Sequence, residues 1–159
     1  FGLNAQRGNV LEFEAQQLFN EHLYLICQAG DPLAKSKSVR MKDLRHHEFI
    51  HSVRSGSVWQ QMLPMVSAAG IRDSGLEVTQ FATMSGLIAN GFGISVVPQF
   101  AVELCRRPGI AVVPVTDTKA RRPIYMIKRK HRSLSVAAAE MWKRLAEAGK
   151  GLTAAPPRK

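Results

Sequence analysis

Residues 81–98 read FATMSGLIANGFGISVVP, and this stretch decides the fold class of the chain. Its first half carries apolar residues at helical spacing and ends at Asn90-Gly91, a pair typical of a helix C-terminus. Its second half, residues 93–97, contains small and β-branched residues and stops at Pro98, as expected of a buried strand. A helix, a glycine turn and a buried strand in this order indicate an α/β sheet.

Strand and helix patterns alternate along the rest of the chain. Because strands that alternate with helices form parallel sheets covered on both faces, we expect a mainly parallel sheet with helices on both sides. The predicted strands are 22–27, 48–51, 76–81, 93–97, 110–115 and 123–130, and the predicted helices are 39–44, 58–69, 84–89, 99–106 and 135–148.

Length and composition describe an ordinary globular chain. Its 159 residues, 45% of them hydrophobic, suffice for one domain or two small lobes with a real core. No apolar run approaches the roughly 18 residues that cross a bilayer, and we expect no membrane partner. The chain starts at Phe1 rather than Met and shows no signal peptide, so we expect a fragment of a cytoplasmic protein.

The two cysteines, Cys27 and Cys105, lie in apolar surroundings. We interpret them as reduced, partly buried thiols, since cysteine is readily buried. A disulfide or a catalytic thiol is the alternative, but no C-x-x-C motif or metal-ligand spacing supports it.

The formal net charge of +10 raises the question of nucleic-acid binding. The basic residues are scattered, and no aromatic residues alternate with them as a platform for single strands requires. We therefore expect a basic, solvated surface, with direct nucleic-acid binding by this segment as an alternative.

Several short motifs, in order, resemble the effector-sensing domain of the LysR-type transcriptional regulators over residues 13–145. The landmarks are the strand 18–26, the turn 30–34 (GDPLA, with Asp31 where the family often has histidine), the short helix 39–44, the strand 48–51, the signature 81–98, and the return strand 123–132 with Leu134-Ser135, where Val136 replaces the family's proline.

This resemblance implies a two-lobed fold of the type 2 periplasmic-binding-protein kind, with a small effector in the cleft. By that mapping, residues 1–16 end the first lobe, 17–130 form a complete second lobe, 131–148 return to the first lobe, and 149–159 form a disordered tail. The resemblance also implies a homodimer or tetramer, and promoter DNA bound through an N-terminal helix-turn-helix that this chain does not contain.

One candidate ligand site follows the strand that ends near residue 51. Ligands of open α/β sheets lie beyond the carboxyl ends of strands, near helix N-termini that favour anions. Here Arg54 can grip a carboxylate, Ser55 and Ser57 can donate hydrogen bonds, Gly56 allows close approach, and Val58 opens the next helix. The family's inducer loop falls at this place. The alternative is a plain helix start with Ser55 or Ser57 as N-cap.

A second candidate site lies at Phe81 and Thr83, after the strand predicted at 76–81. Thr83 could cap the following helix and also point its hydroxyl into the cleft. The alternative is a cap and nothing more.

Metal binding and catalysis are not expected. His47 and His51 stand four residues apart, but a strand between them breaks the helical spacing, and no carboxylate pair or cysteine completes a site. Met84-Ser85-Gly86 is not a nucleophile elbow, and Gly91-Phe92-Gly93 lacks the rest of a phosphate-binding loop. We therefore expect no enzyme activity, no metal and no cofactor.

The residues leave two functions of different class open. The leading hypothesis is the sensing half of a transcription regulator, in which a small, anionic inducer controls DNA binding by the full-length protein. The alternative is a solute-binding protein of the same fold that feeds a transporter. A secretory signal upstream of Phe1 would separate the second from the first.

Overall fold

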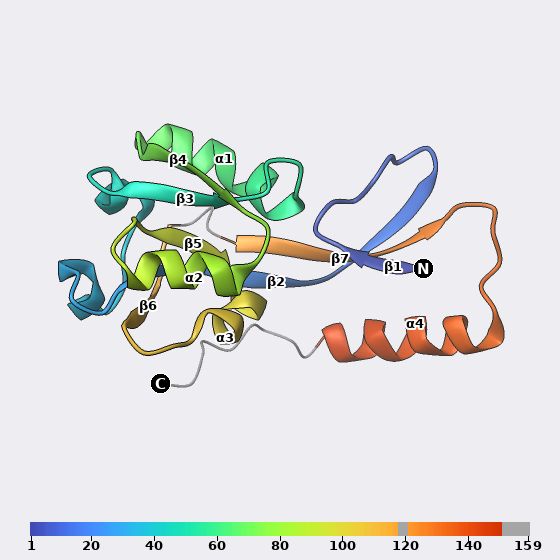
Figure 1. The fold of residues 1–159 in the computed structure, drawn as a ribbon. Coiled ribbons are helices and arrows are strands. Elements are labelled where there is room, and N and C mark those ends of the chain that lie inside the picture. The colour runs from blue at the N-terminus through green and yellow to red at the C-terminus, as the bar shows by residue number, and fades with distance from the viewer. Residues whose placement is uncertain (118–120, 151–159) are drawn as a thin grey trace. The chain divides into compact units, whose positions relative to one another are not determined.

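The computed structural model describes residues 1–117 and 121–150 (Figure 1). The chain divides into two compact units. Unit 1 consists of Phe1–Glu21 and Arg122–Lys159, and unit 2 consists of His22–Arg121. Of the predicted tail, Gly149 is the last residue of a helix, and residues 151–159 lie outside the described part of the chain.

Unit 2 is built on a sheet in which one strand runs against the others. Two parallel strands, β3 (Glu48–Ser52) and β4 (Arg72–Val78), are joined by a parallel bridge between Phe49 and Ile94 to the start of β5 (Ser95–Pro98). The strand β2 (Phe13–Gln28) pairs antiparallel with both β5 and β6 (Ile110–Pro114). It follows that β3, β4, β5 and β6 share one direction, which confirms the expected mainly parallel sheet, and that β2 is the opposing strand.

Helices cover both faces of this sheet (Figure 1). Alternate residues of β2 point to opposite faces, as the strand period requires. Leu23 and Leu25 pack in one core cluster with Trp59 of α1 (Ser57–Ala69). Tyr24 and Ile26 pack in a second cluster with α2 (Phe81–Ala89) and α3 (Val102–Cys105). The predicted helices on both sides of the sheet are thereby confirmed.

Apolar residues at spacings of three and four in α1, from Trp59 to Val66, predict a buried stripe that ends before Gly70, and the structure largely confirms it. Trp59, Met62 and Val66 are buried, whereas Leu63 is exposed because it lies at the edge of the stripe. Gly70 ends the helix with a φ of 65°, a left-handed conformation that glycine adopts without strain.

Two boundaries differ from the prediction. The strand predicted at 76–81 is β4 at Arg72–Val78, and the helix predicted from residue 84 already begins at Phe81. Both differences arise from tertiary packing: β4 takes its limits from its parallel register with β3, and the Phe81 ring packs into the second core cluster.

The signature turn is held against β3 by a glycine. Gly93 has a φ of 137°, and a Cβ there would collide with the backbone carbonyl of Glu48. The N–H of Ile94 donates to that same carbonyl at 2.8 Å. Only glycine allows this close approach between the turn and the strand.

Unit 1 contains β1 (Gly2–Asn4), the first part of β2, most of β7 (Arg121–Arg129) and α4 (Val136–Gly149). A serine at the start of the helical pattern predicts an N-cap at Ser135. The structure confirms it, since Ser135 accepts a hydrogen bond from the N–H of Ala138. The amphipathic pattern of this helix predicts that Met141, Trp142 and Leu145 are buried. This is wrong for Met141, whose side chain is 52% exposed, and Trp142 and Leu145 are only partly buried. The Phe1 ring packs edge-on against Trp142, and the ammonium group of Lys128 lies over the Trp142 ring.

Two 3-10 helices, η1 (Pro32–Lys35) and η2 (Met41–Leu44), occupy the predicted turn and the predicted short helix. A third, η3 (Gln99–Ala101), leads into α3. No helix in the described ranges is long and apolar enough to cross a membrane.

Candidate functional site

The loop between β3 and α1 carries the first candidate site. It turns tightly, since the N–H of Gly56 donates to the carbonyl of Val53 at 2.8 Å. The side-chain amide of Gln60 donates to the carbonyl of Arg54, also at 2.8 Å, and so ties the loop to α1. The loop is thus a defined structure at the carboxyl end of a buried strand.

The serines of this loop are not helix caps. The N-cap of α1 is Gly56, Ser57 is the first helical residue, and within the described residues no side chain caps this end. The alternative of a plain cap by Ser55 or Ser57 is therefore wrong. Val58 packs against the first core cluster and anchors the start of the helix.

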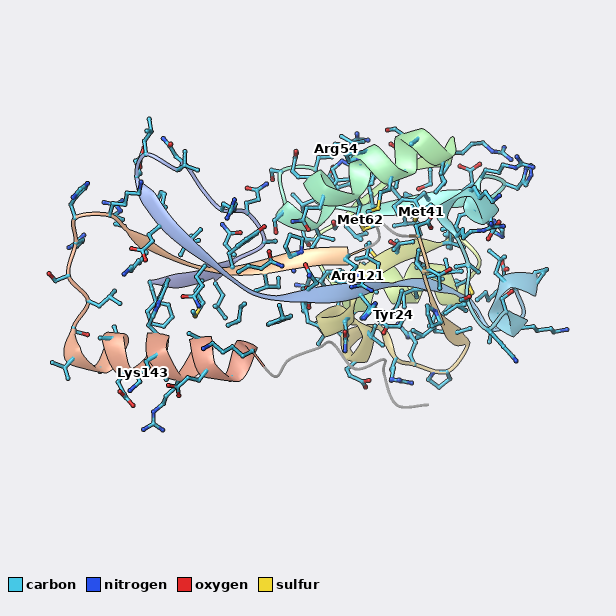
Figure 2. The ribbon with its side chains drawn as sticks, turned by 180° about the vertical axis from the view of Figure 1, so that it is seen from behind. Tyr24, Met41, Arg54, Met62, Arg121 and Lys143 are labelled. Atoms are coloured by element: carbon cyan, nitrogen blue, oxygen red, sulfur yellow. The ribbon has the colours of Figure 1, made fainter. Side chains whose placement is uncertain are left out.

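Arg54 lies beside α1 (Figure 2) and is held by two carboxylates of β4. Its Nη2 donates to Oδ2 of Asp73 at 2.8 Å, and its Nε lies 3.5 Å from Oε2 of Glu77. The guanidinium also lies 6.0 Å from the ring centre of Trp59. Arg54 is thus a cation whose charge is already compensated within the protein.

His51 stands behind these carboxylates and is 1% exposed. Its ring packs on Trp59 at 4.6 Å, and its Nδ1 donates to the carbonyl of Ser52, since a carbonyl only accepts. Its Nε2 lies 3.5 Å from Oδ1 of Asp73 and has no hydrogen-bond partner within the described part of the chain. A buried polar atom therefore points at the carboxylate from the core side.

Burial acts to raise the pKa of Asp73, but hydrogen bonds and charges outweigh it. The N–H of Gly75 donates to Asp73 at 2.9 Å, and Arg54 and His51 favour the ionised carboxyl. The pKa of Asp73 is consequently lowered, and the carboxylate stays charged at neutral pH.

The second candidate site is arranged differently from the prediction. Gln80 is the N-cap of α2, so Thr83 lies inside the first turn, and its predicted role as a cap is wrong. The Phe81 ring packs edge-on against Phe100 at 5.7 Å and contacts the second core cluster.

Thr83 faces an open, mostly apolar groove of about 520 Å³ on unit 2. Arg107 is the cation among the described residues that line it, and its Nη1 lies 3.0 Å from the place of a Cβ on Gly86. Glycine at this position lets the guanidinium lie against α2, a contact that no local pattern in the sequence indicated. The groove is lined by Ala82, Thr83, Gly86, Leu87, Asn90, Phe92 and Arg107.

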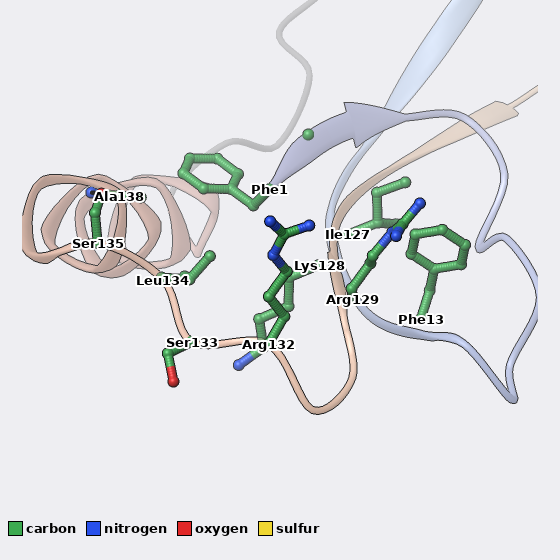
Figure 3. A pocket seen from close by; sticks show the side chains of 11 residues that line it. Phe1, Phe13, Ile127, Lys128, Arg129, Arg132, Ser133, Leu134, Ser135 and Ala138 are labelled. Atoms are coloured by element: carbon green, nitrogen blue, oxygen red, sulfur yellow. Dashed lines mark hydrogen bonds between the residues drawn. The ribbon is translucent and has the colours of Figure 1, made fainter.

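Unit 1 has a cavity of about 410 Å³ that the sequence did not predict (Figure 3). Arg132 lies on its wall between Phe1 and Phe13, with Arg129 nearby. The basic run 128–132 is visible in the sequence as a local charge excess, but nothing local indicates that it lines a hollow. Lys128, which also lines it, is paired with Glu14 at 3.1 Å.

The described residues contain no group of three or more histidines, cysteines or carboxylates that could hold a metal ion. Cys27 and Cys105 are buried in different core clusters and are free thiols in the described part of the chain. Burial raises the pKa of each thiol to about 11, and for Cys27 the nearby Asp31 adds to the effect. Thiols with such a pKa are poor nucleophiles at neutral pH.

Comparison with known proteins gives a consistent result. The family model for the LysR substrate binding domain matches residues 1–150. The chain is 28% identical over 160 residues to an uncharacterized HTH-type transcriptional regulator, YfeR, of Shigella flexneri. That match covers 97% of this chain and 50% of YfeR, so the chain spans about half the length of the curated relatives it matches.

Solved structures share the fold. The effector binding domain of BenM with its effector benzoate superposes with a TM-score of 0.80 at 24% identity, covering 98% of this chain and 72% of that domain. The effector binding domain of QuiR in complex with shikimate gives 0.79 at 20% identity, covering 94% and 71%. The chain therefore has the fold of effector-binding domains related to periplasmic binding proteins.

Proposed function

The chain belongs to the LysR substrate-binding domain family, and from this premise we propose that it is the effector-sensing part of a transcriptional regulator. The family match over residues 1–150 is the observation that carries the proposal. The relatives are HTH-type regulators of about twice the matched length, which supports a DNA-binding domain outside the matched region.

We assign the chain's parts within that function by the family mapping. Residues 1–16 end the first effector lobe, residues 17–130 form the second lobe, and residues 131–148 return to the first. The regulator acts as a homodimer or tetramer, reaches promoter DNA through its N-terminal domain, resides in the cytoplasm and catalyses no reaction.

The proposed effector is a small anion. Benzoate and shikimate, bound by two similar domains, are both carboxylates. In this chain the 54–58 loop offers Arg54 with Ser55, Gly56, Ser57 and Val58, at the carboxyl end of β3, where such ligands lie in α/β sheets. Phe81 and Thr83 at the start of α2 are the second set of candidate contacts.

The effector controls transcription only if it binds two arrangements of the protein with different affinity. A ligand preferred by one arrangement increases its population and thereby changes how the DNA-binding heads are presented. An effector that binds both arrangements equally would leave DNA binding unchanged.

The test combines ligand binding with DNA binding in the full-length protein. A panel of small carboxylates is screened by thermal shift, and the hits are added to gel shifts on the gene's own promoter. We expect a stabilising compound to change promoter affinity, and Arg54→Gln to weaken that response. Arg144→Gln, which removes another solvent-exposed arginine, from α4, is the matched control.

If the full-length protein gives no sequence-specific gel shift, the proposed regulator function is contradicted. Combined with a secretory signal upstream of Phe1, this result would favour a solute-binding protein that feeds a transporter.

A further inference from the structure

Arg54 is engaged by carboxylates of its own chain at the position where an anionic effector would bind. Two of its nitrogens face oxygens of Asp73 and Glu77, at 2.8 and 3.5 Å. A guanidinium recognises a carboxylate through these same N–H groups. An added anion therefore competes with the protein's own groups for Arg54.

The two carboxylates also have contacts other than Arg54. Oδ1 of Asp73 accepts from the N–H of Gly75 at 2.9 Å and faces the buried Nε2 of His51 at 3.5 Å. Oε2 of Glu77 lies 3.9 Å from Nδ1 of the same ring. Because β4 pairs with β3 at His51–Glu77, the backbone also holds them in place. These contacts do not involve Arg54.

The pairs with Arg54 are exposed, which makes them easy to exchange. The side chains of Arg54, Asp73 and Glu77 are 57%, 43% and 41% exposed. Ion pairs in such surroundings are screened by water and change an equilibrium by about fivefold at most. An anion that binds Arg54 can displace the two carboxylates, and its affinity is then lower by this factor of up to about five.

We propose that Asp73 and Glu77 are positioning residues that act as a built-in competitor for Arg54, so that an anionic effector engages the 54–58 loop only by displacing them. The proposal rests on the proposed function, since it assigns a specificity control to the same loop. The proposal implies that the carboxylates of β4 weaken the binding of simple anions to Arg54. A ligand with further contacts to the protein can compensate for displacing them.

The experiment measures Arg54 itself, in the full-length protein, with benzoate and inorganic sulfate as probes at constant ionic strength. Phenylglyoxal labels accessible guanidinium groups, and mass spectrometry of the Arg54 peptide gives the labelling rate with and without each anion. The variants are Asp73→Asn, Glu77→Gln and the double substitution, all of which keep the side-chain size. Glu103→Gln is the matched control, because it removes an exposed carboxylate from another arginine pair, 2.8 Å from Arg106.

We expect the double variant to label at Arg54 about fivefold faster and to be protected by benzoate at about fivefold lower concentration. Glu103→Gln should behave as the unmodified protein, and circular dichroism should show each variant folded. Equal rates and equal protection in all proteins would overturn the proposal, as would a gain of the same size in Glu103→Gln. Absence of protection by either anion in the double variant would also overturn it.

The outcome separates this proposal from the proposed function. If the protein does not shift its promoter but the double variant labels faster at Arg54, the competition for Arg54 is supported and the proposed regulator function is contradicted. If an effector changes the promoter shift but Arg54 labels at the same rate in all variants, the regulator function is supported and the competition for Arg54 is contradicted.

Discussion

Arg122 donates a hydrogen bond to Glu21 at 2.7 Å, and the two side chains are only 10% and 7% exposed. Glu21 lies on β2 and Arg122 on β7, each at the end of a segment of unit 1. The pair therefore joins two strands of unit 1 at the residues where the chain passes to and from unit 2. Burial makes this pair different from the exposed pairs of Arg54, because water screens the two charges much less.

Replacing Glu21 by Ala should lower the free energy of unfolding by about 3–5 kcal/mol, since it breaks a buried ion pair by removing the carboxylate 2.7 Å from the Arg122 guanidinium. Urea denaturation followed by circular dichroism measures the change. Glu103→Ala, which removes an exposed partner of Arg106, should cost less than about 1 kcal/mol. Equal losses of unfolding free energy in the two variants would show that burial does not strengthen the Glu21–Arg122 pair.

Replacing Gly93 by Ala should destabilise the protein by at least about 2 kcal/mol, because the new Cβ meets the Glu48 carbonyl and the φ of 137° disfavours any side chain. The midpoint of urea unfolding reports the loss. Gly30→Ala is the control, since nothing lies within 4 Å of its Cβ position, and it should change stability by less than about 0.5 kcal/mol. A stable Gly93→Ala protein would contradict the close approach of the signature turn to β3.

The two thiols should resist labelling in the native protein. With a pKa of about 11, roughly one thiol in a thousand is ionised at pH 8, and both cysteines are fully buried. We expect slow reaction with 5,5′-dithiobis(2-nitrobenzoate) in buffer and rapid reaction of both thiols in urea. Fast labelling of either cysteine without urea would indicate that its core cluster opens readily.

Asp73 should make a small contribution to stability that disappears in acid. Its folded pKa is lowered below the usual 3.8, so the ionised form stabilises the fold above that value, and the effect is lost as the pH falls through the folded pKa. The difference in melting temperature between the unmodified protein and Asp73→Asn should therefore shrink between pH 5 and pH 2. A difference that stays constant over this range would refute the link to the Asp73 proton.

Local patterns were sufficient for most of the elements. The helix, turn and strand of 81–98, the α1 stripe with its Gly70 end, and the Ser135 cap all appear in the structure. These features depend on neighbours within a few residues, where periodicity and capping chemistry operate. The order of these motifs also indicated the family, because each motif occupies its own place along the chain.

The boundaries that depend on tertiary packing could not be predicted in this way. The start of β4 follows from its register with β3, which shifts between Phe49 and His51. The starts of α1 and α2 carry no side-chain cap within the described residues, so the polar residues nearby gave misleading signals. Met141 shows the same limit, since a helical stripe predicts an apolar face but not what covers it.

The sequence by itself determined that Arg54 stands in a loop after a buried strand, beside serines and a glycine, because this depends only on the order of residues. Only the tertiary structure decided that Asp73 and Glu77 hold the guanidinium and that His51 faces Asp73 from the core. The reason is physical: ion pairs between strands depend on pairing register, and register is set by how the sheet packs against its helices.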